Sequence, residues 1–203
     1  MRQDLKSKAT KELIIQKSFE MFYEKGYNST NIPDIMKETN LSKGAFYHHF
    51  KNKCDIGKIV INKIIKKRIY DGFISPLKDY ENKNIPELIL YVFTQRIKNY
   101  SEKEKQLGCP ANNLINEIGC TQENDFRVLL SGLISDWNES LTKVIKEGVR
   151  KKELHSNVNP KAISTLLIGS FEGIRGIRKV YDDDVIFQDY ISSIKYYIKS
   201  IST

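Results

Sequence analysis

The sequence predicts an all-α protein of about nine helices, with a small N-terminal three-helix bundle and a larger helical domain after it. Three observations predict this fold class. Apolar residues recur at helical spacing along most of the 203-residue chain. Strand-like alternation of apolar and polar residues is rare. Finally, residues 30–53 have the pattern of two short helices joined by a tight turn.

The first helix is expected at about Ser7 to Lys25. It carries a stripe at helical spacing that we expect to form the core of the bundle: Ile14, Ile15, Ser18, Phe19 and Phe22. The second helix opens at Thr30 or Asn31, since either side chain can cap free backbone N–H groups. Asn40 ends it, because Asn tolerates the left-handed conformation of a sharp turn. Ser42 caps the third helix.

The third helix, residues 42–49, is predicted to present one face to DNA. Phe46 and Phe50 are four residues apart and share the inward face. The outward groups are Lys43, Gly44, Ala45, Tyr47 and His48. Gly44 and Ala45 allow close approach to base edges, while Lys43 can reach phosphates or a guanine edge. An ordinary amphipathic hairpin with a solvated face is the alternative interpretation.

The charge distribution favours DNA over that alternative. Residues 1–68 contain 15 Lys and Arg against 7 Asp and Glu, whereas the remaining residues contain 18 of each. The whole formal charge of +8 therefore lies in the part of the chain that carries the turn. A field of one sign around a helical hairpin is typical of a DNA-binding domain.

These residues closely resemble the TetR/AcrR family of bacterial transcription regulators. The resemblance is carried by Phe22-Tyr23-Glu24-Lys25-Gly26-Tyr27, Thr30, Asp34-Ile35, Ser42 to Phe50 and Lys53. Asn40 stands where the family usually has Gly, and Met36 where it usually has Ala. The resemblance implies a homodimer that binds a palindromic operator in double-stranded DNA and leaves it when a small molecule binds the C-terminal domain.

The expected division is a helix-turn-helix DNA-binding domain at 1–53, a connecting helix at about 53–70, and a ligand-binding and dimerisation domain at 54–203. The predicted DNA-contacting residues are Thr30, Asn31, Ser42, Lys43, Gly44, Ala45, Tyr47, His48 and Lys53. Thr30 is one of these residues because the family resemblance implies that this position contacts DNA. The chain has no long apolar run near its start and no stretch of 18 apolar residues, so a cytoplasmic protein without a membrane span is expected.

The C-terminal domain is expected to consist of helices throughout. They begin near Asn84, run from Pro110 to Ile118, from about Asn124 to Lys152 and from Asn159 to Tyr181, and end with one from Asp184 to about Ile201. One helix carries a seam of small and apolar residues: Leu166, Gly169, Gly173, Gly176 and Val180. Three glycines inside a helix cost about 2–3 kcal/mol relative to Ala. The seam therefore indicates either a dimer interface, which the resemblance favours, or room for a ligand.

A ligand pocket is expected inside the C-terminal domain. Its candidate residues are Tyr91, Phe93, Tyr100, Asn113, Glu117, Trp137, Phe171 and Glu172. Each aromatic residue alone is as readily explained by core packing, but together they indicate an apolar or aromatic small molecule.

Cys109, Cys54 and Cys120 are expected to be reduced thiols, since an odd number without Cys-x-x-Cys does not suggest a disulfide framework or a zinc site. Cys109 precedes a predicted helix, so a redox or electrophile sensor is an alternative to a buried small hydrophobe. No catalytic, metal or cofactor site is predicted, because three histidines and no Gly-rich loop do not form one. A transcriptional activator is the other alternative to a repressor.

Overall fold

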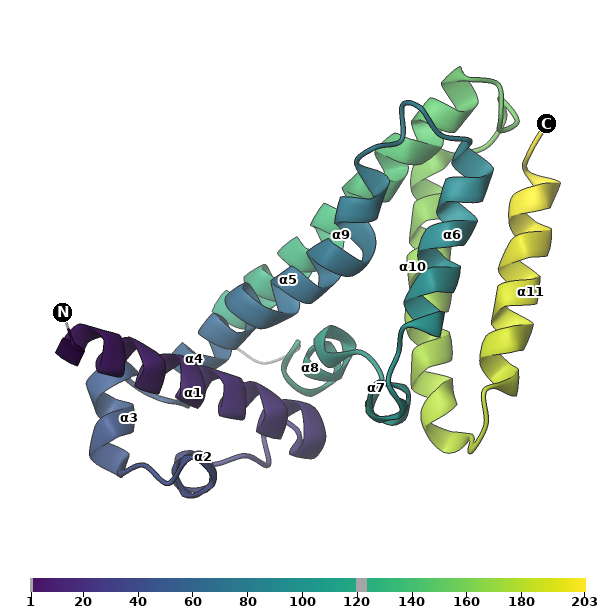
Figure 1. Cartoon of the computed structure of the whole chain (residues 1–203). Helices are drawn as coiled ribbons and strands as arrows, with labels where there is room; N and C mark the ends of the chain where they lie inside the picture. Colours follow the sequence, from purple (N-terminus) through teal and green to yellow (C-terminus); the bar gives the residue numbers. More distant parts are fainter. Residues whose placement is uncertain (1, 120–123) are drawn as a thin grey trace. The chain divides into compact units, whose positions relative to one another are not determined.

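The structure is a computed structural model that describes residues 2–119 and 124–203, so Cys120 lies outside the described residues. The predicted all-α fold is confirmed (Figure 1). Within the described ranges no helix combines the length and the apolar character needed to cross a membrane. The chain divides into two compact units, which are described separately: Met1–Lys67 with Pro110–Ser131, the N-terminal unit, and Arg68–Cys109 with Gly132–Thr203, the C-terminal unit.

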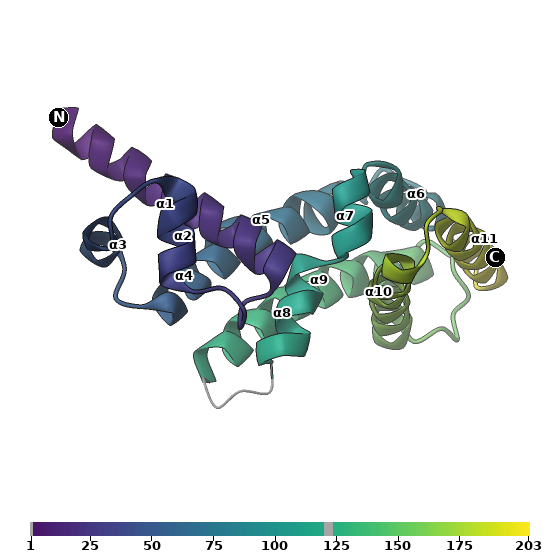
Figure 2. The ribbon, with the colours of Figure 1, turned by 90° about the horizontal axis from the view of Figure 1, so that it is seen from below.

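The N-terminal unit contains the predicted three-helix bundle. Its helices are α1 (Arg2–Lys25), α2 (Ile32–Thr39) and α3 (Lys43–His49). α1 begins earlier than the expected Ser7. Figure 2 shows α2 crossing α1, with α3 at the edge of the bundle. The predicted stripe of α1 is buried, including Ser18, whose hydroxyl donates to the Ile14 carbonyl at 2.7 Å.

The predicted connecting helix is longer and less regular than expected. It starts with α4 (Lys53–Val60) and α5 (Lys66–Ile69), but two π-helical segments interrupt the α pattern, η1 (Ile61–Ile65) and η2 (Tyr70–Ile74). A 3₁₀ turn, η3 (Ser75–Leu77), closes it. π-segments are rare in helices and often lie at functional sites. Apolar periodicity alone does not predict such a change of hydrogen-bond register.

The rest of the N-terminal unit comes from much later in the chain. It comprises α8 (Pro110–Ile118) and the first residues of α9 (Asn124–Arg150). The Phe126 ring packs edge-on against Tyr27, with ring centroids 5.3 Å apart. A Cβ on Gly57 would lie 2.9 Å from Cζ of Phe126, so the close approach of α4 and α9 requires glycine there.

The C-terminal unit contains three long helices besides the remainder of α9. They are α6 (Ile85–Lys98), α10 (Pro160–Ile177), which continues as a 3₁₀ turn η4 (Arg178–Val180), and α11 (Val185–Ser200). In Figure 1, α11 runs beside α6 and α10. The core between these helices is a packed aromatic cluster whose ring centroids lie 4.1 to 6.4 Å apart: Phe73, Phe93, Trp137 and Phe171.

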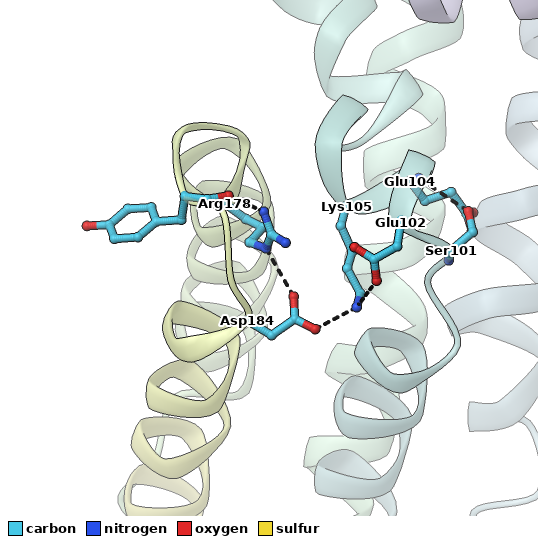
Figure 3. Close-up of polar contacts among 7 residues, drawn as sticks. Ser101, Glu102, Glu104, Lys105, Arg178 and Asp184 are labelled. Atoms are coloured by element: carbon cyan, nitrogen blue, oxygen red, sulfur yellow. Dashed lines mark hydrogen bonds and ion pairs between the residues drawn. The ribbon is translucent and has the colours of Figure 1, made fainter.

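A short helix that was not predicted, α7 (Glu102–Leu107), also belongs to the C-terminal unit. Its signal is present in the sequence, because Ser101 and Glu104 form a capping box. Lys105 on α7 contacts Glu102 at 2.7 Å and Asp184 at 2.5 Å, and Arg178 Nε donates to the same aspartate at 3.1 Å (Figure 3). The hydrogen bond from Lys105 is the largest cause of the lowered pKa of Asp184. These contacts tie the start of α11 to α7.

Candidate nucleic-acid interface and ligand cleft

The turn between α2 and α3 has the predicted geometry. Asn40 adopts a left-handed conformation with φ 54° and ψ 32°, and its N–H donates to carbonyls at the end of α2. Asn31 occupies the N-cap position of α2 without a side-chain hydrogen bond to the helix. The hydroxyl of Ser42 accepts the Ala45 N–H at 3.3 Å and so caps α3. These local bonds fix the direction in which α3 leaves the turn.

α3 separates an apolar face from a polar one as predicted. Phe46 and Phe50 are buried, with ring centroids 5.3 Å apart. Four of the predicted DNA-contacting residues are exposed on α3 itself, namely Lys43, Gly44, Tyr47 and His48, and Asn31 and Ser42 are exposed at the N-caps of α2 and α3. Ala45 is half-buried. A Cβ on Gly44 would meet only the Ser42 hydroxyl, at 3.6 Å, so no contact within the described chain requires glycine there.

Lys53 and Thr30 point into the N-terminal unit. The Lys53 ammonium donates to the carbonyls of Tyr27, Asn28 and Thr30 at 2.9, 3.4 and 3.0 Å, and lies 4.4 Å from the centroid of the Tyr27 ring. Thr30 is fully buried, and its hydroxyl donates to the Gly26 carbonyl at 2.8 Å. An ammonium has three hydrogens, and here all three have acceptors. This geometry gives both residues a structural role in the loop before α2.

Two of the predicted ligand residues, Asn113 and Glu117, lie on α8 in the N-terminal unit. The Glu117 carboxylate accepts the Asn28 N–H at 3.0 Å. It also fills the space beside Gly26, where a Cβ would lie 2.8 Å from Oε1. Gly26 has φ 89°, so glycine is needed for the backbone as well. Glu117 thus supports the same loop that Lys53 supports.

The other six predicted ligand residues belong to the C-terminal unit, where Tyr91 lines an open cleft and the other five are buried or largely buried. Phe93, Trp137 and Phe171 are packed in the aromatic core, and Tyr100 and Glu172 are largely buried beside it. Tyr91 is exposed and lines a cleft of about 390 Å³. The complete lining is Arg68, Asp71, Gly72, Pro76, Tyr91, Val92, Gln95, Arg96, Asn99 and Glu104. Most of these residues are polar, whereas five of the eight predicted residues are aromatic.

Cys109 is buried, with 7% of its surface exposed. Its neighbour Gly108 has φ 75°, and a Cβ there would lie 2.5 Å from Cε of Lys179. Burial lowers the pKa of the Lys179 ammonium, and the adjacent Cys109 acts in the opposite direction. Arg175 donates to the Gly108 carbonyl at 2.9 Å. The thiol therefore lies among cationic groups of the C-terminal unit.

The predicted glycine seam lies on an open face of α10. Leu166 is about half exposed, and Val180 is 82% exposed. A Cβ on Gly169, Gly173 or Gly176 would meet no atom within 4 Å. No packing within the described part of the chain accounts for these glycines, so neither core packing nor an enclosed ligand site explains them.

Two family models match the chain. The model for bacterial regulatory proteins of the tetR family matches residues 14–56, which include α2, α3 and the turn between them. The model for the tetracyclin repressor-like C-terminal domain matches residues 89–194. Together these matches cover the helical bundle with its exposed α3 face and most of the C-terminal helices.

Similar proteins include named regulators. The transcriptional regulator AcuR of Cereibacter sphaeroides is 27% identical over 168 residues, which are 79% of this chain and 72% of AcuR. The HTH-type transcriptional repressor DhaR of a Mycobacterium species is 24% identical over 167 residues, covering 79% and 77%. A crystal structure of a TetR transcriptional regulator from Chloroflexus aurantiacus matches with a TM-score of 0.85 at 23% identity, covering 100% and 98% of the two chains. The last of these similarities concerns the fold alone.

Proposed function

Because this chain belongs to the TetR family of transcriptional regulators, a family of non-enzymatic DNA-binding proteins, we propose that it is an effector-released repressor. Two copies bind a palindromic operator, each inserting α3 of its DNA-binding domain, residues 1–53, into the major groove. Residues 54–203 form the dimer and bind a small apolar or aromatic effector, which releases the operator. The protein acts in the cytoplasm.

One observation carries the DNA-binding part of this proposal: the exposed face of α3. Lys43, Tyr47 and His48 offer groups for phosphates and bases on the same surface as Gly44. Glycine in a helix costs about 1 kcal/mol relative to alanine. Since no neighbour within the described chain requires Gly44, close approach to an external surface explains it best. Because residues 1–68 carry a net positive charge, the negatively charged phosphate backbone of DNA is the surface that suits them.

The dimer is supported in the same way by α10. The open glycines of the seam, flanked by the exposed Leu166 and Val180, allow the backbone of a second copy to approach closely. Repression, rather than activation, is proposed because the similar protein DhaR is named a repressor. Tyr91, on the cleft of the C-terminal unit, is the predicted ligand residue best placed to meet an effector.

The test is binding to duplex DNA that contains the inverted repeats beside the gene of this protein. We expect tight binding with a steep salt dependence, because many phosphates are contacted. Lys43→Ala should reduce affinity and lower the slope of log affinity against log salt by about 1 if it contacts a phosphate. Ala45→Ser should instead change the preferred sequence.

Lys161→Ala is the control, because Lys161 is an exposed lysine of α10 in the C-terminal unit. This variant should leave the operator affinity and the salt slope unchanged. Absence of binding even at low salt would refute the proposal. If transcription rises when the protein is bound to its operator, the protein is an activator and not a repressor.

A thiol sensor acting through Cys109 is a second candidate, favoured by the position of Lys179. A nearby cation stabilises a thiolate, which is the reactive form of cysteine. N-ethylmaleimide should then reduce operator affinity at least 10-fold in the wild type and in a Cys54→Ser/Cys120→Ser variant. Cys109→Ser should be insensitive. Equal sensitivity of Cys109→Ser, measured by fluorescence anisotropy with labelled DNA, would eliminate this sensor.

A further inference from the structure

The cleft lined by Tyr91 contains an arginine, Arg96, that makes no direct ion pair with a described carboxylate. Of the three arginines in and beside the cleft, Arg68 pairs with Glu104, and Arg175 pairs with Glu172 at 3.1 Å. Arg96 forms no ion pair with any described residue. Its Nε–H is buried and finds no acceptor among the described residues. Leaving such a donor unsatisfied is unfavourable, and more so for a charged group.

Glu104 interacts electrostatically with Arg96, which contributes to lowering the pKa of this carboxylate, but its oxygens are hydrogen-bonded to other donors. Oε1 accepts from Arg68, while Oε2 accepts from the backbone N–H and the hydroxyl of Ser101, each at 3.0 Å. The capping box of α7 therefore requires this carboxylate to stay where it is. Arg96 therefore makes no direct ion pair with a described carboxylate, although Glu104 and Asp71 lie in the same cleft.

The side chain of Arg96 is held in place by packing against two aromatic rings and Gly72. Its guanidinium carbon lies 4.8 Å from the centroid of the Tyr100 ring and 5.7 Å from that of Phe73. A Cβ on Gly72 would lie 3.0 Å from Arg96 Nε, so the glycine in the π-segment η2 makes room for the side chain. Burial raises the pKa of Tyr100, which keeps its ring neutral and suited to a cation–π contact. The side chain is thus confined to the cleft wall.

We propose that this cleft binds a small monocarboxylate with an apolar body, its carboxylate pairing with Arg96. An arginine fork matches the two oxygens of a carboxylate. A doubly charged phosphate fits less well, because Asp71 and Glu104 also line the cleft. Tyr91, Val92 and Pro76 provide apolar surface for the rest of the molecule, and about 390 Å³ suits a small molecule. This inference rests on the proposed function and adds the chemical class of its effector.

The experiment compares small monocarboxylates, from acetate to benzoate, with their neutral amides at equal ionic strength. Thermal unfolding and operator binding are measured for each. At least one acid should raise the melting temperature and reduce operator affinity 10-fold or more, while its amide does neither. Arg96→Gln should lose both responses. Arg96→Lys, which keeps the charge without the fork, should retain a weakened response.

Arg150→Gln is the matched control, because Arg150 is an exposed arginine of the same unit, paired with Glu147 at 2.6 Å. It should respond like the wild type. The inference fails if every amide acts as well as its acid, if Arg96→Gln keeps the response, or if inorganic phosphate acts as strongly as the acids. Operator binding without any acid tests the proposed function separately, so the two failures are distinguishable.

Discussion

Gly173→Leu is expected to convert the dimer into monomers and to reduce operator affinity by about 100-fold or more. Gly173 lies on the open face of α10, where the proposed interface needs close backbone contact. A leucine side chain would hold the two helices apart. Operator affinity would fall when the dimer is lost, because two linked DNA-binding domains bind a palindrome far more tightly than one. Light scattering and fluorescence anisotropy with operator DNA measure the two effects.

Unfolding of the protomer would not explain this result. Leucine has a higher helix propensity than glycine by nearly 1 kcal/mol, so the helix itself should be stabilised. Gly132→Leu is the matched control: Gly132 is an exposed glycine of α9, and a Cβ there also meets no atom within 4 Å. If Gly173→Leu remains a dimer with unchanged affinity, α10 is not the interface.

Lys53→Met is expected to lower the free energy of unfolding by about 2–3 kcal/mol, from the loss of three hydrogen bonds to a charged donor. Methionine keeps an apolar stem against the Tyr27 ring but removes the ammonium that joins the carbonyls of residues 27, 28 and 30. The loop before α2 would lose its anchor, and operator affinity would fall as a consequence. Chemical denaturation and operator titration measure both changes.

The same variant separates two roles for Lys53. If it contacts a phosphate, as the family resemblance implies, the salt slope should fall by about 1 while stability stays unchanged. Lys51→Ala is the control, because Lys51 has the same charge two residues earlier and its side chain is exposed. Unchanged stability of Lys53→Met would contradict the structural role.

Features set by neighbouring residues could be predicted well from the sequence. The left-handed Asn40, the cap at Ser42 and the bounds of α8 were all predicted, because turn conformation and helix capping depend on a few adjacent residues. The split of α3 into apolar and polar faces followed from helical spacing. These features suffice for the fold and for the exposed face of α3.

Features set by distant residues could not be predicted in this way. Lys53 meets carbonyls more than 20 residues earlier, and Glu117 meets an amide 89 residues earlier. Arg96 was missed because its unsatisfied Nε is defined by the absence of a partner in three dimensions. Four of the five aromatic residues predicted for the pocket are core residues, with Tyr91 the exception, since periodicity marks burial and does not distinguish a cavity wall from a packed interior.

The contribution of residues 110–131 to the N-terminal unit limits how this regulator can be rearranged by recombination. An excised fragment ending at residue 67 would expose Tyr27 and Gly57, which normally face Phe126, and would leave the Asn28 amide without Glu117. A chimera that exchanges operator-reading segments between paralogues therefore has to transplant two stretches of sequence together. The N-terminal unit that carries α3 is discontinuous in sequence, and gene fusion at a single junction would leave it incomplete.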